Sequence, residues 1–325
     1  MRSKIFNTNA QRTRLVLGML SLVAILTVTA CKNSAPNTAA TESATTQAAY
    51  NTAADAGHAL LAAAQSSDPN ALARVLGTKA RALVTTGNSS TDKDAMDAFA
   101  AKYNRMNRWV TMTDGSQVLH IGADNYEFPI PLSKDASGKW QFDAKLGEQE
   151  ITARNIGRNE LLAIDAVSAI ANAEEMYFKE GHDGNPAHQY AQLIVSNAGK
   201  QDGLYWDVPA GQPDSPLGRV NDFLGSPLSA LPAGQAQAFD GYAFRILSAQ
   251  GEKAKGGAKV YTADGKLKKG FAIIASPVKY GETGIMTFVL NREGIMYQKD
   301  FGAKTADLVQ AIDTYNPDEE WASIE

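Results

Sequence analysis

Two histidines six residues apart, with an aspartate between them, form the densest group of potential metal ligands in the chain. His182, Asp183 and His188 stand in a stretch rich in Gly, Pro and Asn. Imidazole nitrogen suits zinc, and carboxylate and turn oxygens suit calcium. The calcium-hand pattern is incomplete, because no acidic residue stands at the position of its bidentate ligand, and zinc needs a third protein ligand. The favoured interpretation is a solvated loop between two helices, with a metal site at these three residues as the alternative.

A second group combines aromatic rings with one guanidinium, which is typical of a pocket that grips a sugar, a peptide or a carboxylate-bearing ligand. Its members are Tyr205, Trp206, Tyr242, Arg245, Tyr280 and Tyr297. Trp206 stands in a polar loop, where its large ring must be covered or stay exposed. It is therefore the best single candidate for ligand binding. Ordinary cross-strand packing is the competing interpretation of the aromatic residues.

Residues for acid–base or nucleophilic catalysis form no recognisable set. The Gly-x-Ser-x-Gly pattern is missing, and neither His58 nor His120 stands in the context of a catalytic triad. Paired carboxylates such as Glu174 and Glu175 fall where a solvated helix face would place acidic groups. The sequence therefore predicts no catalytic residue and no cofactor.

The only cysteine ends an uncharged apolar run near the N-terminus. Four basic residues precede the run from 15 to 29, and small residues lead to Ala30 and Cys31. A basic region, a short apolar region and a small-residue cleavage site indicate a signal peptide over residues 1–30. The run is short for a spanning helix, which needs about 20 apolar residues. Because cleavage between Ala30 and Cys31 resembles the bacterial lipobox, we expect the Cys31 thiol to carry lipid.

The net charge of the chain limits which partners it can bind, and its cysteine content limits which kinds of site it can hold. The chain has 31 Lys and Arg against 35 Asp and Glu, a formal net charge of −4 at pH 7. Cleavage before Cys31 removes four basic residues and no acidic one, which leaves 27 basic residues (31 − 4) and a net charge of −8. Nucleic acid and anionic lipid surfaces are disfavoured by this charge. With one cysteine, the folded part is expected to hold no disulfide and no metal–thiolate site.

The first half of the chain predicts an α+β module. Residues 31–48 contain no large apolar side chain and are predicted to form a lipidated, disordered tether. In the module, residues 49–150, apolar spacing and caps predict helices over 53–64, 69–76 and 91–103, the last opened by Thr91. A period of two then predicts an antiparallel meander with strands near 109–112, 118–121, 126–132 and 140–142.

The second half, residues 151–325, repeats this order. A strong 3.6-residue stripe predicts a long helix over 159–180 with Asn159 as its N-cap, and short helices follow near 187–195 and 217–224. Strands are expected near 242–247, 258–262, 271–276, 286–290 and 295–299, with a turn at Asp264-Gly265. Thr305 is expected to cap a last helix. The fold class is therefore α+β, with two modules and a long helix packed on an antiparallel sheet of four to five strands.

Several short stretches together resemble one bacterial family. They are Phe128-Pro-Ile-Pro-Leu132, Ile156-Gly-Arg-Asn-Glu160, Tyr190-Ala-Gln192, Asp202-Gly-Leu-Tyr-Trp206, Ser215-Pro-Leu-Gly218, Gly241-Tyr-Ala-Phe-Arg-Ile246 and Tyr297-Gln-Lys-Asp300. Their combination is similar to the family catalogued as Domain of Unknown Function 2950, over roughly residues 50–321. The resemblance implies an organisation and a compartment but no reaction. The second module also looks like the globular head of type IV pilins and pseudopilins. Unlike in pilins, the N-terminus of the chain is lipobox-like and is separated from this head by over a hundred residues.

These observations predict a lipoprotein of the cell envelope that faces the periplasm. Lys32 follows the cysteine where an aspartate would signal inner-membrane retention, so the outer membrane is favoured. The expected role is non-catalytic binding or scaffolding, with the membrane as partner through the lipid anchor and an envelope protein or small ligand as a second partner. Nucleic acid is not expected to bind. Two alternatives stay open: an envelope hydrolase, metal-dependent or not, with a site between the modules, and an accessory of a secretion or pilus machine.

Overall fold

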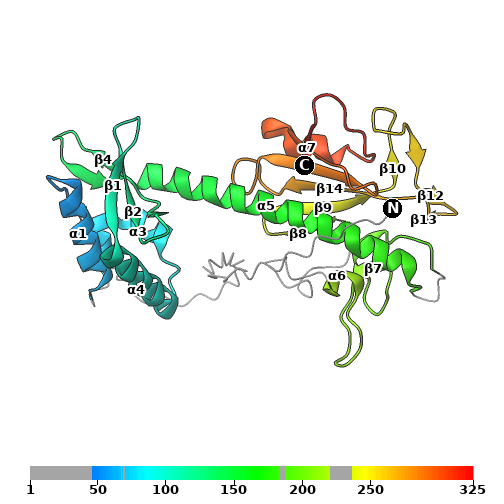
Figure 1. The fold of residues 1–325 in the computed structure, drawn as a ribbon, viewed down its shortest axis with the longest axis horizontal. Coiled ribbons are helices and arrows are strands. Elements are labelled where there is room, and N and C mark those ends of the chain that lie inside the picture. Colours follow the sequence, from blue (N-terminus) through cyan, green and yellow to red (C-terminus); the bar gives the residue numbers. More distant parts are fainter. Residues whose placement is uncertain (1–45, 67, 69, 183–186, 220–235, 325) are drawn as a thin grey trace, which may run out of the picture. The chain divides into compact units, whose positions relative to one another are not determined.

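The computed structural model describes residues 46–324, apart from 67, 69, 183–186 and 220–235 (Figure 1). The predicted signal peptide, most of the predicted tether and the proposed lipid site at Ala30 and Cys31 lie outside the described residues. The chain divides into two compact units, Met1–Glu148 and Gln149–Glu325. They are called the N-terminal and C-terminal units below. None of the described helices is both long and apolar enough to cross a membrane.

Four helices open the described part of the N-terminal unit. They are α1 (Ala53–Ala64), α2 (Ala71–Leu76), α3 (Thr78–Val84) and α4 (Ser89–Arg105). Thr52 and Asp55 form a capping box at the start of α1. The prediction that Thr91 opens the next long helix is wrong, because the side chain of Asn88 accepts hydrogen bonds from the N–H groups of Ser90 and Thr91 and caps α4 three residues earlier. The short helix α3 was not predicted.

An antiparallel sheet completes this unit. Its strands are β1 (Asn107–Thr111), β2 (Gln117–Ile121), β3 (Tyr126–Glu127), β4 (Leu132–Lys134) and β5 (Trp140–Phe142). The order is β1-β2-β4-β5, with β3 paired to β2. Leu60 and Tyr103 from the helices pack with Leu119, Ile130 and Phe142 in one buried cluster. Helices followed by an antiparallel meander are what the sequence predicts for this half.

The long helix α5 spans Ala144–Lys179 and begins fifteen residues before the predicted start. Asp143 precedes it, and its Oδ1 accepts hydrogen bonds from the N–H groups of Lys145 (3.0 Å) and Leu146 (3.1 Å). The prediction that Asn159 caps the helix is therefore wrong. Instead, Asn159 Nδ2 donates to the carbonyl of Thr283 at 3.0 Å, so this amide fastens α5 to another segment of the C-terminal unit.

A six-stranded antiparallel sheet forms the centre of the C-terminal unit (Figure 1). Its strands, in spatial order, are β17 (Ala322–Ile324), β16 (Met296–Asp300), β15 (Met286–Asn291), β14 (Ala272–Pro277), β9 (Tyr242–Leu247) and β8 (Ala236–Phe239). The edge strands β8 and β17 were not predicted. Residues Val167, Ile170 and Tyr177 of α5 pack with Phe244 and Phe288 of the sheet in one buried cluster. The α+β fold class, with a long helix and an antiparallel sheet, is confirmed.

Shorter elements complete the C-terminal unit. They are β6 (Leu193–Val195), β7 (Gly203–Tyr205), α6 (Pro216–Arg219), β10 (Ala249–Gln250), β11 (Lys259–Val260), β12 (Thr262–Ala263), β13 (Lys266–Leu267), the 3-10 turn η3 (Gly302–Lys304) and α7 (Thr305–Gln310). The helix predicted near 187–195 is wrong, because its apolar end forms β6, which pairs in parallel with β7. Thr305 lies within α7, and its hydroxyl donates to the Gly302 carbonyl. The predicted Asp264-Gly265 turn joins β12 and β13, with positive φ at both residues.

Candidate functional site

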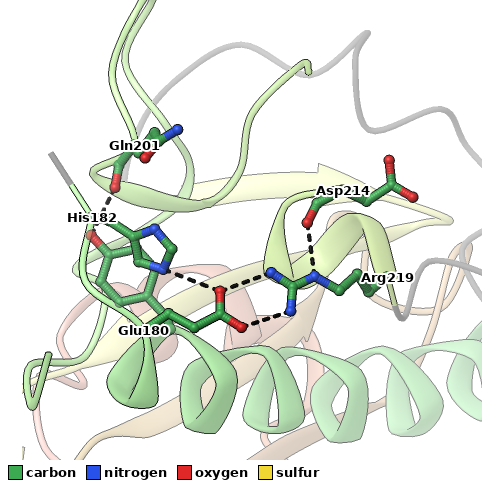
Figure 2. A network of polar contacts seen from close by, with 6 residues as sticks. Glu180, His182, Gln201, Asp214 and Arg219 are labelled. Carbon is green, nitrogen blue, oxygen red and sulfur yellow. Dashed lines mark hydrogen bonds and ion pairs between the residues drawn. The ribbon is translucent and has the colours of Figure 1, made fainter. Parts of the chain in front are cut away.

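An ion pair fastens the C-terminal end of α5 to the helical turn α6 (Figure 2). The Arg219 guanidinium donates from Nη1 and Nη2 to the two carboxylate oxygens of Glu180, at 2.7 and 2.8 Å. Its Nε donates to the Asp214 carbonyl at 2.8 Å. The hydrogen bonds from Arg219 lower the pKa of Glu180, and those to Glu180 raise the pKa of Arg219. The pair is therefore charged over the whole physiological range.

His182 packs between two aromatic rings beside this pair. Its ring centroid lies 4.4 Å from that of Tyr177 and 5.1 Å from that of Trp206, and His182 is only 8% exposed. The Nε2 atom of His182 stands 3.8 Å from Glu180 Oε2, which is too long for a hydrogen bond. The Tyr177 hydroxyl donates to the Gln201 carbonyl at 2.8 Å, so that the loop before β7 is also held to α5 (Figure 2).

Trp206 is the half-buried member of this group of rings, and it meets the buried His182 ring edge to face. The His182 ring in turn lies against the buried Tyr177 ring, and the pair of Glu180 and Arg219 stands beside His182. Next to Trp206, Tyr205 donates its hydroxyl to Asp207 at 2.8 Å. We call Tyr177, Glu180, His182, Trp206 and Arg219 the Trp206 platform. The platform combines a half-buried aromatic ring with charged and hydrogen-bonding groups beside it.

The structure describes two of the three predicted metal ligands, His182 and His188. Asp183 lies outside the described residues. His188 has a positive φ of 78° and packs its ring against Phe178, at 5.3 Å between centroids. His182, by contrast, packs against Tyr177 and Trp206. No group of three His, Cys, Asp or Glu side chains suited to a metal occurs among the residues that the structure describes. The metal site stays a prediction.

Arg245, Tyr242 and Tyr280 of the predicted aromatic group make their contacts elsewhere in the C-terminal unit. Arg245 Nη2 donates to the carbonyls of Val309 (3.0 Å) and Ile312 (2.5 Å), at and beyond the end of α7. Tyr242 is fully buried, and its hydroxyl donates to the Met286 carbonyl at 2.8 Å. Because they stand three residues apart on β9, Tyr242 and Arg245 face opposite sides of the sheet. The Tyr280 hydroxyl reaches Asp300 at 3.3 Å. Of the predicted group, the platform and its border include only Trp206 and Tyr205.

The model of a protein family described as "Protein of unknown function (DUF2950)" matches residues 47–324. The chain belongs to this family. No curated protein matches the chain, and no solved structure does either. Two stretches that carry the resemblance to DUF2950 border the Trp206 platform, namely those that end at Trp206 and at Gly218. A third stretch, which ends at Glu160, lies within α5. It connects α5 to the start of β15, since Glu160 Oε1 accepts hydrogen bonds from the N–H groups of Ile285 (2.9 Å) and Met286 (3.0 Å).

The sequence did not predict the environment of Glu174. It was interpreted as part of a solvated face, but its exposed fraction is 0%. Its Oε2 accepts a hydrogen bond from the N–H of Ala191 at 2.8 Å, while Oε1 has no partner among the described residues. Burial raises the pKa of the Glu174 carboxyl well above its usual range, the Ala191 N–H partly offsets this rise, and the Glu175 charge adds to it. The signal was available, because Glu174 continues the spacing of the buried Val167, Ile170 and Tyr177.

Proposed function

We propose that this chain is a lipid-anchored binding protein of the cell envelope that faces the periplasm and presents the Trp206 platform to its ligand. The observation that carries the proposal is the half-buried Trp206 ring, which makes an edge-to-face contact with the ring of the buried His182. Trp is the residue type most often found to dominate binding energy when it is set in a well-packed surround. A saccharide ring or a peptide side chain would cover its open area.

The support beneath Trp206 favours binding by a preformed surface. Three segments meet there: the end of α5, the loop that leads to β7, and α6. The bidentate pair of Arg219 and Glu180 adds geometric specificity, because two parallel hydrogen bonds fix the relative orientation of α5 and α6. A surface that is already ordered loses less conformational entropy when it binds a ligand.

The anchoring part of the proposal is supported by the sequence alone. Cys31 closes the leader, and fourteen residues, 32–45, separate it from the first described residue. Fully extended, such a segment spans at most about 50 Å. The folded chain would thus stay close to the membrane surface. Replacing Cys31 with Ser should move the protein from the detergent-extracted membrane fraction to the soluble fraction. Unchanged partitioning, with unchanged mass of the N-terminal peptide, would refute lipid attachment.

Binding is tested with the chain from Lys32 onward, which contains every described helix and strand. We expect it to co-sediment with purified peptidoglycan sacculi, whose sugar rings and peptides offer both kinds of ligand. Trp206→Ala should weaken this binding about tenfold or more. The control is Leu308→Ala, which shortens another exposed apolar side chain of the same unit and should leave binding unchanged. Equal binding by both variants would contradict the proposal, and turnover of the sacculi that is lost on a His182 or Glu180 substitution would favour a hydrolase.

A further inference from the structure

A depression in the N-terminal unit is independent of the Trp206 platform. Its volume is about 610 Å³, and it lies between the β1–β2 and β4–β5 hairpins with Leu146 of α5 in its wall. Pockets for small molecules generally measure about 300–1,000 Å³. Its lining includes Asp114, Gln117, Lys134 and Trp140. The depression therefore combines two opposite charges, an amide and an aromatic ring.

The two charged residues in the lining do not pair with each other. Within the part of the chain that the structure describes, no ion pair involves Asp114 or Lys134, although both line the same depression. Asp114 is held in place because its Oδ1 accepts hydrogen bonds from the N–H (2.9 Å) and the hydroxyl (2.7 Å) of Ser116. These bonds to Ser116 lower the pKa of Asp114, which is ionised at neutral pH. Opposite charges that line one depression without pairing match a ligand that carries both signs.

The remaining lining supplies an apolar wall and a hydrogen-bonding group. The Lys134 Nζ lies over the Trp140 ring, 5.0 Å from its centre, so the cation contacts one face of this aromatic ring. Lys134 and Trp140 are also direct partners in the pairing of β4 with β5. The side-chain amide of the half-buried Gln117 makes no hydrogen bond to the described residues and is available to a ligand. Gln117 pairs with Thr111 of β1 and Leu132 of β4, which places it between the two hairpins.

We propose that this depression binds a small zwitterion, namely an amino acid or a short peptide. The ligand's carboxylate pairs with Lys134 and its ammonium group with Asp114. Gln117 bonds the ligand's amide, and Trp140 with Leu146 covers its apolar part. This site does not depend on the proposed role of Trp206, because the two lie in different units.

The test follows the ring nitrogens of the four tryptophans in the chain from Lys32 onward, labelled with ¹⁵N-tryptophan. Comparison with Trp140→Phe assigns the Trp140 signal. Alanyl-alanine should shift this signal in a saturable way. The N-acetylated and C-amidated dipeptides, each lacking one charge, should bind about 10- to 100-fold more weakly, since hydrogen bonds to charged groups contribute that much.

Two variants locate the charges. Lys134→Gln should weaken binding of the dipeptide by a similar factor and remove the penalty for amidation. Asp114→Asn keeps an acceptor for the Ser116 bonds and should remove the penalty for N-acetylation. Lys139→Gln, an exposed lysine of the same hairpin outside the lining, is the matched control and should bind like the unsubstituted chain. The proposal is overturned if the Trp140 signal does not saturate, if both capped dipeptides bind as well as the free one, or if the control loses as much affinity as Lys134→Gln.

Discussion

Replacing Glu174 with Gln should change how the stability of the C-terminal unit depends on pH. The carboxyl is completely buried in α5, with one hydrogen bond from the Ala191 N–H and no partner for Oε1 among the described residues. Gln keeps the shape and the acceptor for Ala191 but has no charge. The amide does not ionise, so the part of the difference between the two chains that varies with pH measures the cost of an ionised group at this position.

The magnitude follows from the environment of the carboxyl. An uncompensated buried charge destabilises a fold by about 3–5 kcal/mol, and one hydrogen bond to a charged group offsets about 1.5–3 kcal/mol of this. The net penalty of ionised Glu174 is thus about 2 kcal/mol. Because burial raises the folded-state pKa of Glu174 above its unfolded value, the full stability is present below the unfolded pKa. Stability is lost as the pH rises through the folded-state pKa.

Urea unfolding at a series of pH values from 4.5 to 9, monitored by near-ultraviolet circular dichroism, measures the effect. The difference in the free energy of unfolding, Glu174→Gln minus unsubstituted, should rise by about 2 kcal/mol across this range. Asp165→Asn, an exposed position on the same helix, is the control and should stay within about 0.5 kcal/mol throughout. A difference for Glu174→Gln that is constant with pH would refute the argument that burial raises the folded-state pKa of Glu174.

Three further substitutions test the packing by urea unfolding. Gly284→Ala should lower the free energy of unfolding by about 1–3 kcal/mol, because a Cβ there would lie 2.2 Å from the hydroxyl oxygen of the buried Tyr242. An unchanged free energy of unfolding would mean that the Tyr242 ring can move aside. Gly157→Ala should raise it by about 0.5–1 kcal/mol, since this position of α5 has open space around a Cβ, and a decrease would contradict the helical assignment. Arg245→Met should lower it by about 1.5–3 kcal/mol, because two carbonyls near the end of α7 lose a charged donor; an unchanged value would show that water replaces it.

The sequence predicts elements well where apolar periodicity is strong. The strands near Trp109, Leu119 and Phe142, and the four inner strands of the second sheet, lie close to where alternation places them. Helix starts are predicted less well, because several polar residues near each start are competent caps. Asn88 caps α4 in place of Thr91. Asp143 precedes α5, which begins at Ala144, fifteen residues before the predicted start at Asn159. The edge strand β17 pairs with β16, which lies well before it in the chain, so local pattern does not reveal it. The edge strand β8, by contrast, pairs with the next strand β9 across a turn at Asp240-Gly241, a local hairpin signal that the prediction missed.

For the candidate site too, the sequence predicts features that depend on neighbouring residues and misses contacts between residues far apart in the chain. Trp206 could be singled out because a large ring in a polar loop is a local anomaly. Its contacts with His182, and the pairing of Glu180 with Arg219, join residues up to 39 positions apart, and no spacing rule predicts them. The sequence predicted aromatic rings beside a cation at other positions, in the group that contains Trp206 and Arg245. A depression that combines the two is lined by Trp140 and Lys134, which meet only because β4 and β5 pair in that register.

Polar side chains along α5 explain why so long a helix is needed in the C-terminal unit. Asn159 and Glu160 bind the backbone from Thr283 to Met286, Glu174 binds the backbone of Ala191, and Glu180 binds Arg219. These contacts fasten loops or short elements that have little apolar surface of their own to bury. A helix that only covered the sheet would not need a buried carboxylate, since an apolar residue at that position is often at least as stabilising. The polar positions of α5 therefore serve to place its surrounding loops, and the loop that leads from Trp206 to α6, where Arg219 binds Glu180, is one of them.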